Sequence, residues 1–433
     1  MKVIVLKGTL SHRDAELSEI PPKFFREVDL SAYTKSVEMK VAKQEGAYRS
    51  RQGATITPLP LWAVEFQTVR RKVGANYQVL PLREKELFVV RTVSWASEVS
   101  GTGVEKEKWR GLSLSGPCSS SNIFAVVSSA WLVPFALAHR YLVYIPAEIK
   151  GRGKSATVVV RHDFADYKSS PLKQWTGTEV TPDEKAIKDW TARAQKVWDK
   201  NRTDKSAKLV TERIDYQSTL SSQQPKVFRV VHTRSRSFYA AVLGPRMRTA
   251  LGLPFDAAKI QTRDDGKIIT TAYLPVAGVI CDNLLHSVAV DSEEEAYWMM
   301  GLFNSQAFGR LVMKDARGEP PGIYTIPAKL MAVLGLEFDD SNKLHLELAN
   351  VAQTLEKKMV ETLRGYLTKE KNVAIRNVDD TDQSPVIPST ISSALVRRLD
   401  ARDELKHLEI IASSIMKQKR KAGQSLNSAN HVF

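Results

Sequence analysis

The sequence predicts an α+β fold, and three patterns lead to that prediction. Short runs rich in β-branched and aromatic residues, which are typical of strands, dominate residues 1–150. Helix starts with capping residues and acidic first turns appear further along the chain. Apolar residues three and four positions apart, which are typical of amphipathic helices, dominate residues 344–416. We therefore expect a mixed, β-rich N-terminal domain, a second α+β domain, and long helices towards the C-terminal end.

The composition is that of a globular protein with a basic balance of charge. The chain has 433 residues, 43% of them hydrophobic and 26% charged, which is enough for two or three domains with proper cores. Lys and Arg number 63 against 48 Asp and Glu, so the formal net charge is +15. Such a charge favours a polyanionic partner where it is clustered. Nucleic acid is the partner that we expect, and a solvated basic surface is the alternative.

The cysteines and the apolar runs favour a cytoplasmic protein without a membrane partner. Cys118 and Cys281 are far apart and no CxxC spacing occurs, so neither a disulfide framework nor a zinc site is indicated. The first residues, MKVIVLKGTLSH, lack the apolar stretch of a signal peptide. No window reaches the ~18 consecutive apolar residues that a membrane span needs.

Residues 1–150 are expected to form a mixed α/β N-terminal domain. The expected strands are VIVL, PLWAVEF, LFVVRTV and YLVYIP. The longest apolar run, IFAVVSSAWLVPFALAH at 123–139, is cut by two serines and by Pro134. We expect a buried helix over 122–132 that ends in a turn.

Residues 151–226 are expected to form a helical connecting segment. Thr181 supplies an N-cap, Pro182 suits the first helical position, and acids follow in the first turn. The helix should run to about Lys200. One side of it is apolar, with Ile187, Trp190, Ala194, Val197 and Trp198.

Residues 227–343 should contain a hairpin and an interrupted helix. The run VFRVVHTRSRSFYAAVL at 227–243 predicts two strands that meet at a tip holding Arg234 and Arg236, with Arg229, Arg246 and Arg248 adding charge around it. A second turn is expected at 264–266, followed by strands. Asp291 or Ser292 then caps a helix with three glutamates in its first turn.

That helix contains YWMMGLFNSQAFGRLV, in which Asn304 and Ser305 interrupt a good apolar pattern. Both side chains bond backbone groups that a broken helix leaves free. We expect Asn304 and Ser305 to end or kink the helix and so to position the basic segment from Arg310 to Arg317, in preference to contacting bases directly.

The C-terminal region is expected to be a helical spacer. A long amphipathic helix is predicted over 344–367, a polar linker over 377–389, and a last helix over 391–416. These helices should pack on each other or on a partner subunit. The basic tail at 417–433 is expected to be disordered.

The sequence contains none of the common short motifs for hydrolysis or nucleotide binding. Neither HExxH, GxSxG, GxGxxG nor GxxxxGK[ST] occurs, so we predict no catalytic, cofactor-binding or metal-binding residues. One pattern offers an alternative: Glu38 and Lys40 are spaced as Glu-x-Lys in a β-like run downstream of Asp29, as in many metal-dependent nucleases. An exposed alternating strand explains the same residues and is the interpretation that we favour.

Several stretches together resemble one family. They are GATITPLPLWAVEF at 53–66, SSAWLVPFALAHRYLVYIP at 128–146, the tryptophan-rich helix with the arginine hairpin at 190–243, and HSVAVDSEEEAYWMMGLFNSQAFGRLV at 286–312 followed by GIYTIPAKLMAVLGL. From near its start to about residue 410, the chain resembles the region that follows the catalytic core in large adenine-specific DNA methyltransferases of restriction-modification systems. The last pair of stretches is the most specific.

The resemblance implies a target recognition half that reads double-stranded DNA. The family's Asn/Asp/Ser-Pro-Pro-Tyr/Phe motif, which binds the flipped base, is absent: IPPK at 20–23 and EPPG at 319–322 supply only the prolines. The glycine-rich cofactor motif is absent too. The chain is thus expected to be a separate specificity subunit or part of a split enzyme, with S-adenosylmethionine bound by a catalytic methyltransferase partner. A structural RNA-binding protein is the remaining alternative.

Arginine and lysine side chains are the candidates for DNA contact, because they bind phosphates and, for arginine, guanine edges. We expect contacts from Arg234, Arg236, Arg246, Arg248, Arg310, Lys314, Arg317 and Lys329.

Overall fold

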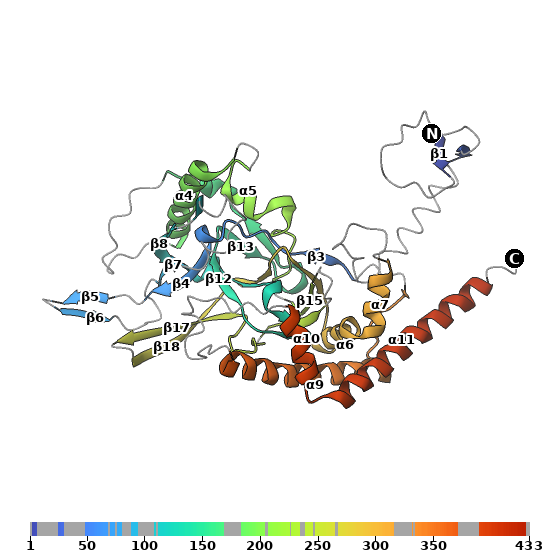
Figure 1. Ribbon diagram of the computed structural model, residues 1–433. Coiled ribbons are helices and arrows are strands. Elements are labelled where there is room, and N and C mark those ends of the chain that lie inside the picture. Colours follow the sequence, from blue (N-terminus) through green and yellow to red (C-terminus); the bar gives the residue numbers. More distant parts are fainter. Residues whose placement is uncertain are drawn as a thin grey trace.

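The computed structural model of the protein has an α+β fold, as the sequence predicts (Figure 1). The structure describes residues 2–6, 25–29, 48–67, 70–73, 76–79, 88–93, 108–109, 111–168, 183–203, 207–225, 227–233, 239–245, 247–264, 267–315, 331, 334–370 and 389–429. Two larger sheets and several hairpins come from the part of the chain before residue 290, and long helices follow.

The larger sheet has six strands in the order β19-β9-β12-β4-β7-β8. They are β4 (Ala63–Gln67), β7 (Phe88–Thr92), β8 (Ser115–Cys118), β9 (Ile123–Val127), β12 (Tyr141–Tyr144) and β19 (Gly278–Cys281). All neighbours are antiparallel except β19 and β9, which run parallel. The sheet therefore joins the early strands to β19, which begins at Gly278, 155 residues after the start of β9 at Ile123.

The predicted helix over 122–132 is wrong. Ile123 to Val127 form strand β9, which is buried along its whole length and pairs with β12 on one side and β19 on the other. A strand covered on both faces has no alternation of apolar and polar residues, so its sequence looks like that of a buried helix. Beyond β9, Ser128 caps a 3-10 turn, η5 (Ser129–Trp131), and the short strands β10 (Leu132–Val133) and β11 (Ala136–Leu137) follow.

Two helices, α4 (Asp183–Asn201) and α5 (Val210–Ile214), lie against this sheet. Helix α4 matches the predicted range, although Thr181 and Pro182 lie outside the described residues. Trp190 is fully buried and its indole Nε1 donates to the backbone O of Leu61 at 3.0 Å. This bond fixes α4 against the segment that leads into β4.

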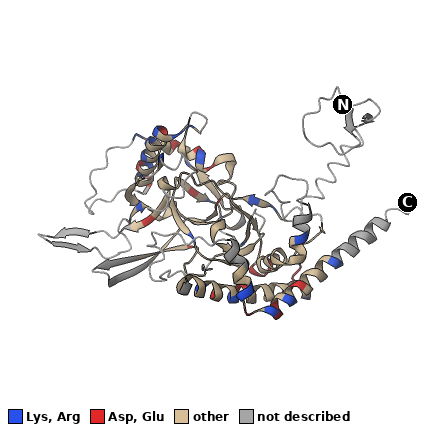
Figure 2. Ribbon diagram, in the orientation of Figure 1, with Lys and Arg blue, Asp and Glu red and all other residues tan. Residues whose placement is uncertain are grey.

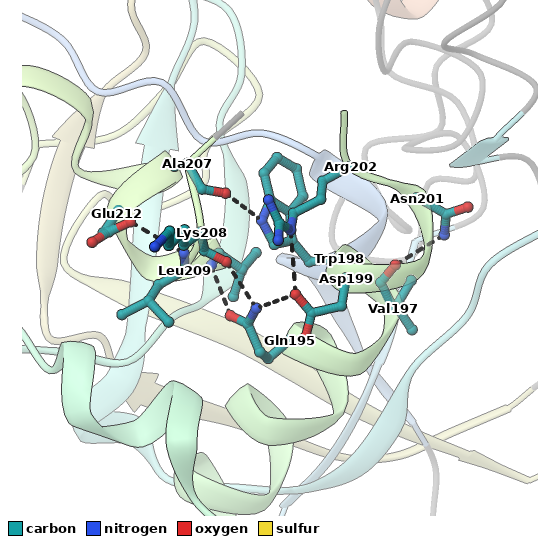
Figure 3. A network of polar contacts seen from close by, with 11 residues as sticks. Gln195, Val197, Trp198, Asp199, Asn201, Arg202, Ala207, Lys208, Leu209 and Glu212 are labelled. Atoms are coloured by element: carbon teal, nitrogen blue, oxygen red, sulfur yellow. Dashed lines mark hydrogen bonds and ion pairs between the residues drawn. The ribbon is translucent and has the colours of Figure 1, made fainter. Parts of the chain in front are cut away.

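A polar network joins α4 to α5 (Figure 3). The Nε2 atom of Gln195 donates to Asp199 and to the backbone O of Lys208, and its Oε1 accepts from the backbone N of Val210 at 2.8 Å. Trp198 is bonded to the backbone O of Ala207 at 3.0 Å. Since the first turn of α5 has backbone N–H groups without helical partners, Gln195 secures the start of that helix.

The second sheet is antiparallel, with the order β16-β15-β20-β3. Its strands are β3 (Ser50–Gln52), β15 (Arg229–Thr233), β16 (Ala240–Leu243) and β20 (Leu285–Ala289). The predicted hairpin is confirmed as β15 and β16, in which Val231 pairs with Ala241. Val230 and Val242 face a core shared with the C-terminal helices, whereas Val231 and Leu243 face the core of the six-stranded sheet. The second sheet thus lies between the two cores.

The remaining strands form two-stranded hairpins. They are β1 (Lys2–Leu6) with β2 (Phe25–Asp29), β5 (Arg70–Val73) with β6 (Asn76–Val79), β13 (Ala147–Lys150) with β14 (Thr157–Val160), and β17 (Ala257–Asp264) with β18 (Lys267–Pro275). Asp264 pairs with Lys267, which agrees with the turn predicted at 264–266. In Figure 1 the β17–β18 hairpin extends away from the two sheets.

The C-terminal helices pack on the second sheet through α6 (Glu293–Asn304). Every residue of α6 from Ala296 to Phe303 is buried, because α6 lies between strands β15 and β16 on one side and α9 (Lys343–Gly365) on the other. At the crossing with α9, Gly301 leaves room for Leu348 and Ala352, which lie 3.1–3.2 Å from the position of a Cβ atom. The other helices are α7 (Gln306–Asp315), the π-helical turn η10 (Tyr366–Glu370), α10 (Ser389–Arg398) and α11 (Arg402–Ala429).

Two predictions for the C-terminal region are wrong. The single helix predicted over 391–416 is divided into α10 and α11, because Leu399 and Ala401 turn into the core and Lys358 of α9 donates to the backbone O of Asp400 at 2.7 Å. The predicted disordered tail is helical as far as Ala429, since Lys, Arg, Gln and Ala are good helix formers.

Residues 430–433, and the linker predicted over 377–389 apart from Ser389, lie outside the described residues. The prediction that the two long helices pack on each other is confirmed by the contact of α11 with α9.

The predicted domain boundaries stay predictions, but strands cross them. Strand β3 from the first segment pairs with β20, and β19 pairs with β9. Within the described residues, no helix is both long enough and apolar enough to cross a membrane.

Candidate nucleic-acid interface

The break between α6 and α7 is built around the carboxamide of Asn304. Its Oδ1 accepts from the backbone N of Ala240 at 3.1 Å, and its Nδ2 donates to the backbone O of Ala240 at 2.8 Å and of Met300 at 3.1 Å. Ala240 belongs to β16, which is the edge strand of its sheet. Asn304 therefore bonds both backbone groups of Ala240, although the O atom of Ala240 also accepts from the backbone N of Phe135 at 2.9 Å.

Ser305 completes the break with one buried hydroxyl group. Its backbone is extended, with ψ 141°, and its Oγ donates to the backbone O of Leu302 at 2.7 Å. The same Oγ accepts from the backbone N of Phe308 at 3.2 Å, which is the bond of a helix N-cap. Ser305 thus closes α6 and opens α7.

A carboxylate from the C-terminal helix bonds the other free amides of α7. The two oxygens of Glu409, on α11, accept from the backbone N of Gln306 at 2.6 Å and of Ala307 at 3.3 Å. The first three amide groups of α7 are therefore all bonded, one by Ser305 and two by Glu409. A negative group here also meets the positive end of the helix dipole.

The start of α7 and the tip of the β15–β16 hairpin lie at the same end of the second sheet. Ala289, where β20 ends, pairs with Arg229 at the end of β15 farthest from the tip. Helix α6 then runs back to Ala240, the first residue of β16 after the tip. Thr233 and Tyr239 close the base of the tip by a backbone bond of 3.0 Å. The segment that carries Arg234 and Arg236 joins the sheet at these two residues and itself lies outside the described residues.

Two of the predicted cations lie on α7. Arg310 is exposed and donates to Oε1 of Gln306 at 3.1 Å, one turn back along the helix. Lys314 follows one turn later in α7. The side chain of Lys314, and the whole of Arg317 and Lys329, lie outside the described residues.

Arg248 is not brought together with the hairpin tip. It follows the end of β16 that is farthest from the tip, beyond a strand of four residues. Its exposed guanidinium donates to the backbone O of Gly252 at 2.8 Å, within the same turn. Arg246 lies outside the described residues.

Arg229, which the sequence suggests as one more surface cation near the tip, is buried instead. Only 1% of it is exposed, and its Nη2 donates to the backbone O of Val279 on β19 at 2.7 Å. It lines a cavity of about 80 Å³ together with Leu243, Asp256 and Val276, and burial lowers the pKa of its guanidinium. Its place inside the apolar run VFRVV was the one sequence signal for this burial.

Cations on α4 and on the C-terminal helices lie among acidic residues. Figure 2 shows both charges along α4 and along the C-terminal helices. Lys188 pairs with Glu184 at 2.6 Å on α4, and Lys358 of α9 pairs with Glu404 of α11 at 2.6 Å. These elements are therefore mixed in charge, and the hairpin tip with α7 is the candidate interface.

The nuclease alternative lies mostly outside the described residues. Asp29 ends β2 opposite Lys2, whereas Glu38 and Lys40 lie outside the described residues. In the part of the chain that the structure describes, no three His, Cys, Asp or Glu side chains form a group that could hold a metal ion.

Cys118 and Cys281 are buried free thiols, and burial raises the pKa of Cys281 to about 11. Burial lowers the pKa of His232 to about 3, so this imidazole is neutral near neutral pH.

Comparison with known proteins identifies no family. No protein-family model and no curated protein matches the chain. The resemblance to the recognition half of adenine methyltransferases therefore depends on the stretches quoted above, and the function that follows from it is a proposal.

Proposed function

We propose that this protein is the DNA-recognition subunit of an adenine-N6 DNA methyltransferase of a restriction-modification system. In this function it binds double-stranded DNA, and a catalytic partner subunit binds S-adenosylmethionine and transfers the methyl group. The order of the resembling segments, the lack of a base-binding Pro-Pro-Tyr motif and the net charge of +15 support the proposal.

The joint between α6 and β16 is the main structural support for this function. The hydrogen bonds of Asn304 to Ala240 tie the start of α7 to the base of the arginine hairpin. The hairpin segment with Arg234 and Arg236 and the helix α7 are about 70 residues apart in the sequence. Both thus begin at the same end of the second sheet. Cations that converge in this way can follow the phosphates of one duplex, which supplies affinity, while a few side chains read base edges.

The support under this end of the sheet is rigid, because the sheet that carries the hairpin is buried on both faces. Rigid elements hold contact residues with less loss of entropy on binding than loops do. We expect Arg234, Arg236, Arg310 and Lys314 to contribute most to DNA binding. Arg248, at the far end of β16, is expected to contribute least.

Fluorescence anisotropy of the full chain with a labelled duplex tests this proposal. Replacing Arg310 and Lys314 together by alanine should weaken binding about tenfold and reduce the slope of log K against log salt by about 2, because two phosphate contacts are lost. The matched control replaces Lys185 and Lys200, two exposed lysines of α4, and should change neither value. Equal losses in both double variants would contradict the assignment of the interface.

A methyl-transfer assay separates the recognition subunit from a complete enzyme. The purified chain should transfer no methyl group to DNA that it binds, and activity should appear when a catalytic partner with an Asn-Pro-Pro-Tyr motif is added. Methylation by the isolated chain would contradict the proposal, and stronger binding to RNA than to the same DNA sequence would favour an RNA-binding protein.

A further inference from the structure

Helix α7 is short, and its position depends on contacts at its first turn. It has 10 residues, and isolated helices shorter than about 12–15 residues are marginal in water. The bonds at its start come from two sources: Ser305, which is adjacent in sequence, and Glu409, which belongs to α11 and follows more than 100 residues later.

Glu409 is held in place by the packing of α11. Its neighbour Leu408 and the next residue but one, Ile411, are buried in the core that α11 shares with α6 and α9. Helix α11 also contacts α7 directly. The carboxylate is therefore presented to α7 from a fixed helix and does not reach it from a loop.

We propose that Glu409 is a positioning residue that sets the orientation of α7, and with it the direction in which Arg310 points. This inference rests on the proposed DNA-binding function. Through Glu409, helix α11 controls the geometry of the interface on α7.

Simple electrostatics and positioning make opposite predictions for the loss of this carboxylate. An anion near bound DNA repels the phosphates, so its removal should strengthen binding if charge were its only effect. If Glu409 orients α7, its removal should weaken binding although a repulsive charge is lost. The sign of the change therefore distinguishes the two roles.

The experiment compares Glu409→Gln with Glu404→Gln in the full chain. Glu404 is also on α11 and also accepts an interhelical bond, from Lys358 at 2.6 Å, but this bond is made to α9 and not to α7. Both variants lose one negative charge from the same helix. We expect Glu409→Gln to weaken duplex binding about fivefold and to speed hydrogen exchange of the amides of residues 306–308, while Glu404→Gln changes neither.

Three results would overturn different parts of this proposal. Unchanged exchange at 306–308 in Glu409→Gln would overturn the role of Glu409 at the start of α7. Faster exchange with equal or tighter duplex binding would overturn its effect on the interface. If the wild-type chain binds no duplex DNA, the proposed function fails and the link to DNA fails with it, whereas normal wild-type binding with an unaffected variant defeats this inference alone.

Discussion

Asn304 uses one side chain to finish a sheet and to end a helix. A carboxamide has both a donor and an acceptor, so it can bond the N–H and the C=O of the same residue on an edge strand. The carboxylate of aspartate or the hydroxyl group of serine cannot supply both groups in that geometry. The identity of this residue, and not only its polarity, therefore matters for the joint between α6 and α7.

Replacing Asn304 with alanine should lower the free energy of unfolding by about 1–3 kcal/mol, because it removes the acceptor of the backbone N–H of Ala240. The backbone O of Ala240 keeps its bond from the backbone N of Phe135. Asn304→Asp should be comparably damaging, since a carboxylate cannot donate to the backbone O atoms of Ala240 and Met300. Urea denaturation measures the change, with Asn350→Ala on the exposed side of α9 as the control. A loss as small as that of Asn350→Ala would contradict this account of the joint.

Gly53 and Gly309 should respond to alanine in opposite directions. A Cβ atom on Gly53 would lie 1.8 Å from the backbone O of Asp282, whereas nothing lies within 4 Å of a Cβ atom on Gly309. Gly53→Ala should destabilise the protein by roughly 3 kcal/mol or more, because backbone must shift. Gly309→Ala, inside α7, should stabilise it by about 0.5–1 kcal/mol. Thermal unfolding of the two variants side by side checks both signs.

At the scale of elements, the α6–α9 contact contains a carboxyl group that titrates near neutral pH. Tyr297 on α6 donates to Glu356 on α9 at 2.5 Å. Burial, with a smaller contribution from Glu293, raises the pKa of Glu356 from 4.5 to about 7, against the lowering effect of the bond from Tyr297. The folded protein thus holds a proton on Glu356 at pH values where the unfolded chain has released it.

This raised pKa predicts the sign of a pH effect. Between the two pKa values the folded state binds more protons than the unfolded state, so the free energy of unfolding falls as pH rises from about 4.5 to about 7. The loss should be on the order of 1–2 kcal/mol, since the group is only part-buried. Glu356→Gln should remove this part of the pH dependence and stabilise the protein at about pH 8. Glu361→Gln, exposed on the same helix, should leave the profile unchanged.

Elements with a one-sided pattern could be predicted from the sequence, and elements defined by distant contacts could not. Helix α4, the β15–β16 hairpin and the capped start of α6 each carry local signals, and the structure has them at the expected residues. Strand β9 carries no alternation because both of its faces are buried. The division between α10 and α11 depends on Lys358, more than 40 residues earlier.

The features of the candidate interface also differ in whether the sequence could predict them. The break at Asn304 and Ser305 could be predicted because polar residues interrupt an apolar pattern. The bond from Glu409 and the burial of Arg229 could not, since both depend on where remote segments lie after folding. Arginines close in sequence, such as Arg229 and Arg248, proved to have different environments.

At the scale of the whole molecule, the second sheet contributes side chains to both cores. Val230 faces one core and Val231 the other, so loss of either core exposes one face of the same sheet. We expect the sheets and the C-terminal helices to unfold in one cooperative transition. Circular dichroism and tryptophan fluorescence should give the same urea midpoint in the wild type, and Val230→Ala and Val231→Ala should each lower both midpoints together. A variant in which the two midpoints separate would show that the cores unfold independently.

The parallel pairing of β19 with β9 has a consequence for biosynthesis. Until the ribosome has released residues 278–281, one edge of β9 has no neighbour, although this strand is apolar along its length. Unprotected apolar edges promote association between nascent chains, and contacts this distant in sequence form slowly. Truncated chains that stop shortly before residue 278 should therefore require chaperones or aggregate, whereas those that extend past residue 281 should show a marked gain in yield of dispersed protein.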